Sequence, residues 1–272
     1  MKYQRRRRLY SQNFLHSPEL IAKLIGISSI GKNDTVVEIG PGRGLITRRL
    51  LEIAGKVIAI ELDNKLYLKL KNKFTRSKNL DLVNADFLKF NLPNYGYKVF
   101  ANIPFIITAD IIRKLTSDNN FLEGYLVVQK ESARKFIGMP HDNRNQMIAT
   151  LLKPWFEIDI FWKFKREDFI PYPRVDSVML NVKRLDKPLI SYGRKKSYRD
   201  FVVYYYNHFR VARLDFSQFL KLFSEYMLSA DKNRKEKVSR EAERILEVQK
   251  GIQKIHRTRK DRNWYKFRSR RN

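Results

Sequence analysis

Short apolar runs alternate with helical segments over the first two thirds of the chain. Five of these runs are rich in β-branched and aromatic residues and are predicted to be strands: residues 35–40, 56–63, 80–87, 98–105 and 125–130. The intervening segments carry apolar residues at helical spacing. Ser17 is a candidate helix N-cap, followed by Pro18 at the first helical position. This alternation predicts βαβ units, with a mostly parallel sheet covered by helices.

Two further strand-like runs, residues 157–164 and 177–184, are joined by a proline-rich loop without a helical pattern. We predict that they form an antiparallel hairpin at one edge, which brings the sheet to seven strands. After Pro188 the strand signature disappears. Helices are predicted there over residues 198–214, 216–228 and 233–249.

These patterns predict four parts of the chain. We expect a basic N-terminal arm (1–12), an α/β domain (13–187), a small helical domain (188–250) and a flexible basic, aromatic tail (251–272).

Composition excludes several classes of protein. The 272 residues include no cysteine, which rules out disulfide scaffolds, thiolate metal sites and cysteine nucleophiles. The four histidines are scattered, so no metal site is expected. No apolar run reaches the ~20 residues of a membrane helix, and the basic N-terminus lacks the pattern of a secretory signal. We therefore expect a cytoplasmic, monomeric protein with no membrane partner.

Charge points to a polyanionic partner. Lysine and arginine number 56 against 28 acidic residues, for a net charge of +28. Residues 1–12 contribute +5 and residues 249–272 contribute +9, so the body of the chain carries the other +14. Because each phosphate contact releases counterions and adds affinity, such a field favours a nucleic acid as partner.

A glycine-rich turn follows the first predicted strand of the α/β domain. Gly40, Gly42 and Gly44 precede a helical pattern, and Glu61 closes the next strand. An acid at that point can accept both hydroxyls of a ribose, as in nucleotide-binding α/β folds. The spacing differs from G-x-G-x-x-G and no phosphate loop is present, so the pattern favours a ligand with a ribose but no phosphate at this turn. S-adenosylmethionine fits that description, whereas a purely structural turn is the alternative.

Asp86 and the segment 102–105 end the next two predicted strands. Asp86 can accept a hydrogen bond from the adenine amino group of the ligand, or it can serve only as a helix N-cap. Asn102-Ile103-Pro104-Phe105 would border the ligand crevice at the carboxyl ends of the strands. The Asn102 side-chain oxygen and the Ile103 carbonyl can accept the hydrogens of a target amine, Pro104 stiffens the turn, and Phe105 can stack on a base. The alternative is an ordinary Asn-x-Pro turn.

Six ordered motifs resemble the ribosomal RNA adenine N6-methyltransferases, which include the Erm macrolide-resistance enzymes and the KsgA-type small-subunit dimethyltransferases. They are residues 12–15 (QNFL), 38–44 (EIGPGRG), 61–63 (ELD), 85–87 (ADF), 102–105 (NIPF) and 169–177 (FIPYPRVDS). The resemblance implies a Rossmann-like class I S-adenosylmethionine-dependent methyltransferase with a mostly parallel seven-stranded sheet and a small all-helical C-terminal domain that binds rRNA.

The resemblance also implies a role for each matching residue. Asn13 and Leu15 would line the methionine side and the entrance of the cofactor pocket, and Gly40 and Gly42 would approach the cofactor closely. Glu61 would hold the ribose hydroxyls and Asp86 the adenine. Asn102 would lie between the cofactor and the target amine, with Ile103, Pro104 and Phe105 completing the catalytic segment. Many relatives have tyrosine at the position of Phe105, a change that keeps stacking and removes a hydroxyl.

Within this family the residues favour the Erm type. Residues 102–105 read Asn-Ile-Pro-Phe instead of the Asn-Leu-Pro-Tyr usual in KsgA types, and the basic tail occurs in some Erm members. An Erm-type enzyme would methylate one adenine of 23S rRNA and block macrolide, lincosamide and streptogramin B antibiotics. A KsgA-type enzyme would instead dimethylate two adjacent adenines of 16S rRNA. A non-catalytic assembly factor and a DNA adenine methyltransferase are further alternatives that the motifs disfavour.

Overall fold

The structure is a computed structural model, and it describes residues 13–138, 146–209 and 214–251. Its internal contacts divide the chain into two units, Met1–Gly193 and Arg194–Asn272. The predicted basic arm and the predicted tail beyond residue 251 lie outside the described residues. Each unit is described by itself below.

The first unit is built on a seven-stranded sheet with the order β4-β3-β2-β5-β6-β9-β7. Its strands are β2 (Thr35–Ile39), β3 (Lys56–Glu61), β4 (Leu80–Asn84), β5 (Tyr97–Asn102), β6 (Phe121–Gln129), β7 (Phe156–Lys163) and β9 (Ser177–Arg184). Neighbours from β4 to β6 are parallel, whereas β9 is antiparallel to both β6 and β7. The mostly parallel seven-stranded sheet and its antiparallel pair at one edge are therefore confirmed.

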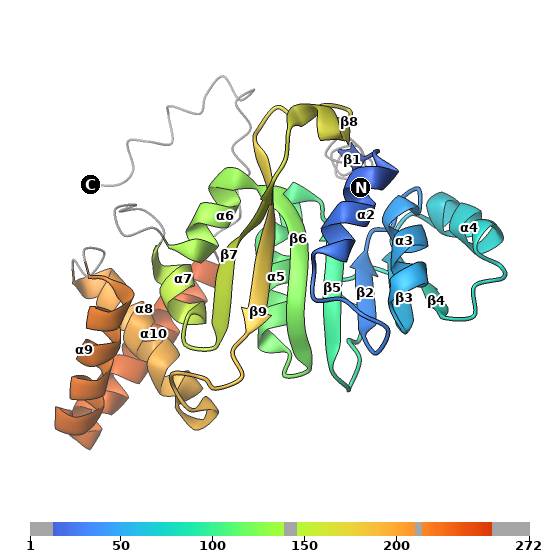
Figure 1. Ribbon diagram of the computed structural model, residues 1–272. Coiled ribbons are helices and arrows are strands. Elements are labelled where there is room, and N and C mark those ends of the chain that lie inside the picture. Colours follow the sequence, from blue (N-terminus) through green and yellow to red (C-terminus); the bar gives the residue numbers. More distant parts are fainter. Residues whose placement is uncertain (1–12, 139–145, 210–213, 252–272) are drawn as a thin grey trace. The chain divides into compact units, whose positions relative to one another are not determined.

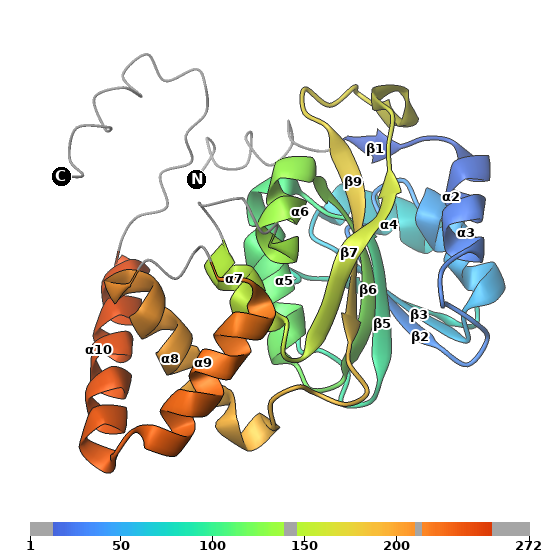
Figure 2. The same ribbon diagram turned by 60° about the vertical axis from the view of Figure 1, so that its left-hand side comes forward.

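Helices cover both faces of this sheet (Figures 1 and 2), with α2 and α3 on one face and α5 and α6 on the other. The helices of the unit are α2 (Pro18–Gly26), α3 (Leu45–Ile53), α4 (Asn64–Lys73), α5 (Thr108–Ser117), α6 (Lys130–Ile137) and α7 (Gln146–Leu152). The N-cap prediction is confirmed, since the Ser17 hydroxyl accepts the backbone N–H of Leu20 at 3.1 Å. Among the described residues, no helix is both long enough and apolar enough to cross a bilayer.

The apolar faces of α2 and α3 form one core with the sheet. Ile21, Leu24 and Leu50 are at most 1% exposed and pack with Val36 of β2 and Phe100 of β5. Burial of such side chains stabilises a fold by roughly 1.5–3 kcal/mol each. This core fixes the two helices that flank the glycine turn, and with them the position of the turn itself.

The strand predicted over 56–63 ends at Glu61, because Asp63 caps helix α4, and three further predicted strand limits are also wrong. The strand predicted over 80–87 ends at Asn84, because Asp86 begins a turn in which its side chain accepts the N–H of Leu88. The strand predicted over 98–105 ends at Asn102, two residues before Pro104, which has no N–H for the ladder. The strand predicted over 125–130 begins four residues earlier, at Phe121.

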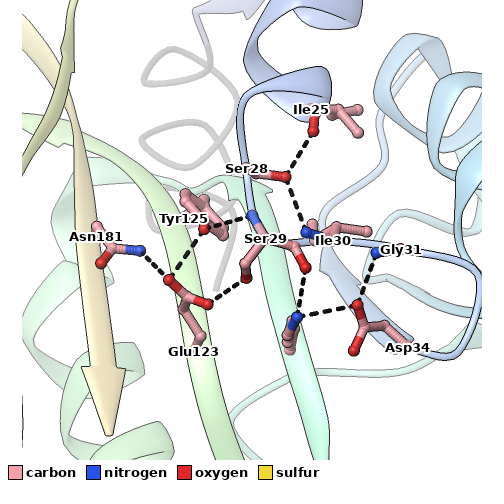
Figure 3. Close-up of polar contacts among 10 residues, drawn as sticks. Ile25, Ser28, Ser29, Ile30, Gly31, Asp34, Glu123, Tyr125 and Asn181 are labelled. Carbon is pink, nitrogen blue, oxygen red and sulfur yellow. Dashed lines mark hydrogen bonds and ion pairs between the residues drawn. The ribbon is translucent and has the colours of Figure 1, made fainter. Parts of the chain in front are cut away.

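A buried polar network at Glu123 explains why the hydrophobic pattern did not predict the first residues of β6 as a strand (Figure 3). Glu123 is 6% exposed, and its carboxylate accepts hydrogen bonds from Ser29, from Tyr125 at 3.0 Å and from Asn181 at 2.9 Å. A buried carboxylate is tolerated because its lone pairs are satisfied. The network ties the loop after α2 to β6 and β9 at the edge of the sheet where the parallel strands begin.

The second unit consists of α8 (Lys195–His208), α9 (Phe216–Ser229) and α10 (Lys232–Gly251) in its described part. An aromatic cluster joins α8 to α9, in which the Phe201 ring lies 5.5 Å from Phe219, 5.2 Å from Phe223 and 4.8 Å from Tyr226. The helix predicted over 198–214 ends at His208, and residues 210–213 lie outside the described residues. The helical character predicted for this region is confirmed for its described residues.

Candidate active site

The glycine turn after β2 holds three residues in the left-handed region, where φ is 69° at Gly40, 59° at Gly42 and 74° at Gly44. A Cβ on Gly42 would lie 2.8 Å from the Phe14 ring, and one on Gly44 would lie 2.7 Å from Leu70 of α4. A Cβ on Gly40 would meet no atom within 4 Å. Packing therefore requires glycine at 42 and 44, whereas Gly40 faces open space that a ligand can approach.

That open space is a pocket at the carboxyl ends of β2 and β5, where ligands bind in open α/β sheets. Seven residues predicted for the site line it: Asn13, Leu15, Gly40, Asn102, Ile103, Pro104 and Phe105. Gly42, Glu61 and Asp86 do not line this pocket. The sequence analysis missed seven other lining residues: Phe14, His16, Pro41, Arg43, Leu45, Ile46 and Ile170.

Glu61 is the last residue of β3 and only 3% exposed. Its Oε2 accepts the backbone N–H of Gly42 at 3.1 Å, and its Oε1 accepts that of Asp63 at 2.9 Å. Burial raises the pKa of Glu61, while these backbone donors act in the opposite direction. Each carboxylate oxygen keeps a further lone pair, so the group is fixed in orientation and can still accept ribose hydroxyls.

Asp86 follows β4 in a half-buried turn. Its Oδ1 accepts the N–H of Leu88 at 3.0 Å. One carboxylate oxygen therefore caps the local turn, which is the alternative to a ligand-binding role that the sequence left open. Lys114 of α5 stabilises this turn by donating hydrogen bonds to the carbonyls of Phe87 at 2.8 Å, Leu88 at 3.1 Å and Phe90 at 2.5 Å. Burial lowers the pKa of Lys114, and the nearby Asp86 carboxylate partly offsets that effect. No sequence pattern indicated Lys114, because its partners lie more than twenty residues earlier.

Asn102 ends β5 with its side chain anchored across the pocket. Its Nδ2 donates to the backbone carbonyl of Asn13 at 2.6 Å. Within the described residues its Oδ1 has no hydrogen-bond partner, so this acceptor stays available. In an ordinary Asn-x-Pro turn the asparagine side chain bonds to nearby backbone. Here it bonds to a residue 89 positions away, and a buried Ile103 (2% exposed) fixes the turn beneath it.

Phe105 lies directly after Pro104, at the start of the 3₁₀ turn η1 (Phe105–Ile107). Its side chain is half-buried, packs partly against the core and lines the pocket. Asn102, which has a free amide oxygen, and Phe105, which has an aromatic ring, thus line the same cavity.

Two motifs that are far apart in the sequence close the pocket together. The short strand β1 (Phe14–Leu15) pairs antiparallel with β8 (Phe169–Ile170), and His16 Nε2 hydrogen-bonds the Glu167 carbonyl at 2.7 Å. The Arg43 side chain lies over the Phe14 ring, 5.6 Å from its centroid. Among the described residues, no group of three or more histidine or acidic side chains is arranged to bind a metal.

Glu38, two residues before Gly40, is 1% exposed, and neither of its carboxylate oxygens has a hydrogen-bond partner of good geometry among the described residues. Burial raises the pKa of Glu38 to about 8, and repulsion from Glu61 adds to this, while Thr47 opposes it. The carboxyl group is therefore mostly protonated near neutral pH.

Comparison with known proteins identifies close relatives. The profile of the ribosomal RNA adenine dimethylase family matches residues 3–241. A Limosilactobacillus reuteri protein named rRNA adenine N-6-methyltransferase is 35% identical over 239 residues, 80% of this chain and 96% of that protein. A Fusobacterium nucleatum subsp. nucleatum protein named ribosomal RNA small subunit methyltransferase A is 37% identical over 180 residues, 64% of this chain and 67% of that protein. The crystal structure of 23S rRNA methyltransferase ErmE is 28% identical and superimposes with a TM-score of 0.66, covering 77% of this chain and 84% of ErmE.

Proposed function

The chain belongs to the ribosomal RNA adenine dimethylase family, and from this premise we propose that it methylates N6 of one specific adenine in 23S rRNA. As a member, it is an rRNA adenine N6-methyltransferase and uses S-adenosylmethionine as methyl donor. The proposal concerns the target and the residues that act on it. The observation that carries it is the anchored Asn102 side chain, which lines the pocket together with Phe105 and keeps its amide oxygen free of partners among the described residues.

Cofactor binding is assigned to residues from four segments. Glu61 accepts the ribose hydroxyls, Asp86 uses the carboxylate oxygen that does not cap its own turn for the adenine amino group, and Gly40 lets the backbone approach the cofactor. Asn13 and Leu15 bound the entrance of the pocket, and Gly42 directs its N–H to Glu61. When bound, S-adenosylmethionine supplies an electrophilic methyl group.

The target amine needs help because its lone pair is delocalised into the adenine ring. The Asn102 Oδ1 accepts one amine hydrogen and the Ile103 carbonyl accepts the other, which favours a pyramidal nitrogen with its lone pair directed at the methyl group. Phe105 stacks on the target base and Pro104 keeps the segment rigid. On transfer, the bond between the sulfonium sulfur and the methyl carbon would break, leaving S-adenosylhomocysteine, and the methylated nitrogen would release a proton to solvent, so no general base is required. Catalysis rests on positioning and on fixed dipoles.

Two features support 23S rRNA as the substrate. The Asn-Ile-Pro-Phe segment 102–105 resembles the Erm type, and the structure of the 23S rRNA methyltransferase ErmE is similar over most of the chain. Methylation of that adenine would make a sensitive host resistant to macrolides, lincosamides and streptogramin B.

A second candidate substrate is 16S rRNA. The similarity to a small-subunit methyltransferase from Fusobacterium nucleatum subsp. nucleatum favours it, and in that case two adjacent adenines would be dimethylated. A non-catalytic assembly factor is less well supported, since such a protein has no physical need for an anchored Asn102 or a buried, oriented Glu61.

The test is methyl transfer to defined RNAs. The purified protein is incubated with methyl-labelled S-adenosylmethionine and either protein-stripped 23S rRNA or immature 30S subunits, and the modified base is mapped. We expect label at a single adenine of 23S rRNA. Asn102→Ala should abolish it, whereas Asn91→Ala, which removes the same group from an exposed loop position, should not.

Other outcomes would change the assignment. Label at paired adenines of the 30S particle would replace the 23S proposal with the 16S alternative. Tight binding of either RNA without transfer would contradict the catalytic role of the 102–105 segment. Transfer that survives in Asn102→Ala at the wild-type rate would overturn the mechanism while leaving the target intact.

A further inference from the structure

Helix α4 carries a line of lysines on its solvent face. Lys65, Lys69 and Lys73 follow one another at i, i+4 spacing and are all exposed; we call them the α4 lysine stripe. Residues four apart are neighbours on a helix surface, and the stripe extends over ~12 Å along the axis. The segment from 62 to 80 contains six lysines and arginines and a single acid, Asp63.

The stripe is not neutralised by the protein itself. The Asp63 carboxylate accepts the backbone N–H groups of Lys65 at 2.8 Å and Leu66 at 3.2 Å, so it caps the helix. Within the described residues, no carboxylate lies within ion-pair distance of Lys65 or Lys69. An acid one turn away from a surface lysine would stabilise a helix, and α4 has no acid at that spacing from Lys65 or Lys69. The like charges along one face repel each other, which a polyanionic partner would relieve.

The stripe ends at the rim of the candidate active site. Lys73 Nζ donates to the Arg43 carbonyl at 2.9 Å, and Arg43 lines the pocket. α4 also packs directly on the glycine turn, since a Cβ on Gly44 would lie 2.7 Å from Leu70. Figure 1 shows α4 beside α3, the helix that begins at this turn. A polyanion that reaches the pocket is therefore close to the stripe.

We propose that the α4 lysine stripe binds the phosphate backbone of the RNA that flanks the target adenine. This inference rests on the proposed function, because it needs RNA at the pocket. Phosphate contacts of this kind carry no sequence information, but they add affinity and fix the register of the RNA over the site. The stripe thereby holds the flanking strand while the Asn102–Phe105 segment acts on the base.

The test is the salt dependence of RNA binding in a double variant, Lys65→Gln with Lys69→Gln. Lys73 is kept, because its bond to Arg43 supports the glycine turn. The matched control is Lys32→Gln with Lys187→Gln. These two exposed lysines lie in the loops before β2 and after β9, at the end of the sheet opposite to the pocket. Binding to the rRNA that the wild type methylates is measured between 50 and 200 mM salt, conditions over which phosphate contacts weaken strongly.

We expect the stripe variant to bind RNA about tenfold more weakly at low salt, with the slope of log affinity against log salt reduced by about 1.5. The control variant should match the wild type, and both should bind S-adenosylmethionine with unchanged affinity. Lys65→Glu with Lys69→Glu should weaken RNA binding further. A lower affinity with an unchanged salt slope would overturn the proposal, as would equal losses in the stripe and control variants.

The outcomes also separate this inference from the proposed function. If the wild type methylates rRNA and the stripe variant binds that RNA normally, the stripe proposal alone fails. If the wild type neither binds nor methylates rRNA, both fail.

Discussion

At the scale of single residues, the site depends on side chains whose partners are backbone atoms far away in the sequence. Asn102 bonds to the carbonyl of Asn13, Glu61 to the N–H of Gly42, and Lys114 to three carbonyls of the turn after Asp86. Backbone partners do not depend on the identity of another side chain. These contacts fix the orientation of each functional group before any ligand arrives, which lowers the cost of binding.

Lys114 is expected to act on the cofactor through the Asp86 turn. Lys114→Met removes the hydrogen bonds that the ammonium group donates to the carbonyls of Phe87, Leu88 and Phe90. Of these three carbonyls, that of Phe87 keeps the backbone N–H of Phe90 as a partner at 3.2 Å. We expect the Kd for S-adenosylmethionine to rise about tenfold, since a lost charged hydrogen bond is worth ~1.5 kcal/mol or more. The rate at saturating cofactor should change little. Isothermal titration and initial rates give the two values.

The matched control for Lys114 is Lys89→Met, an exposed lysine close to the same turn. It should leave the cofactor Kd unchanged, and Lys114→Arg should recover part of the loss. An unchanged Kd in Lys114→Met would mean that the turn keeps its shape without the lysine.

Because the pKa of Glu38 is raised in the folded protein, we expect the free energy of unfolding to depend on pH. The folded-state pKa of Glu38 is raised from 4.5 to about 8, so the folded protein retains a proton that the unfolded chain releases. The free energy of unfolding should therefore fall as the pH rises through that window, by at most ~1.4 kcal/mol per pH unit. Glu38→Gln cannot ionise and should flatten this fall. Urea unfolding without cofactor between pH 5 and 8 measures both curves, and parallel curves would contradict the prediction.

At the scale of elements, the glycines of the turn after β2 differ in role: one borders the pocket, and the other two pack against neighbouring elements. Gly40 faces the pocket, while Gly42 abuts Phe14 of β1 and Gly44 abuts α4. The pairing of β1 with β8 closes the pocket from the other side. The turn is therefore held by three elements, and each glycine is required for a different reason.

Substitution by alanine should separate these roles. Gly40→Ala and Gly44→Ala both place a Cβ at positive φ, which costs ~1–2 kcal/mol. Only Gly44→Ala also collides with Leu70 and Phe74, each 2.7 Å from the new atom, so it should lower the melting temperature more. Gly40→Ala should lose more cofactor affinity relative to its loss of stability. Thermal melts paired with cofactor titration test this, and equal ratios in the two variants would contradict it.

At the scale of the whole molecule, the net charge of +28 is spread over the ends and the body of the chain. The α4 lysine stripe is one structured part of that charge. The terminal segment 252–272, outside the described residues, carries nine lysines and arginines against one acid together with Trp264, Tyr265 and Phe267. Such a composition suits phosphate contacts combined with base stacking.

Deletion of residues 252–272 should weaken RNA binding and flatten its salt dependence, while cofactor affinity stays the same. A full-length variant in which the nine cations of this segment are replaced by glutamine separates charge from length and should behave like the deletion. Filter binding over a salt series provides the measurement. Equal affinity and slope in the deleted protein would show that RNA binding resides elsewhere.

The amino-acid sequence alone was enough to predict the seven-stranded sheet, its antiparallel pair, the helical second unit and half of the residues that line the pocket. Those features follow from local periodicity, from the left-handed glycines and from acids placed at strand ends. The limits of β4, β5 and β6 were less well predicted, because a turn at Asp86, a proline and a satisfied buried Glu123 interrupt the periodic pattern.

How distant segments meet cannot be predicted from local patterns and is seen only in the folded chain. The contact of Lys114 with the Asp86 turn, the pairing of β1 with β8 and the bond from Asn102 to Asn13 each join residues separated by at least 24 positions. The same holds for the alignment of the α4 lysine stripe with the pocket rim through Arg43. Such contacts involve backbone groups, which are the same at every position and leave no trace in the pattern of side chains.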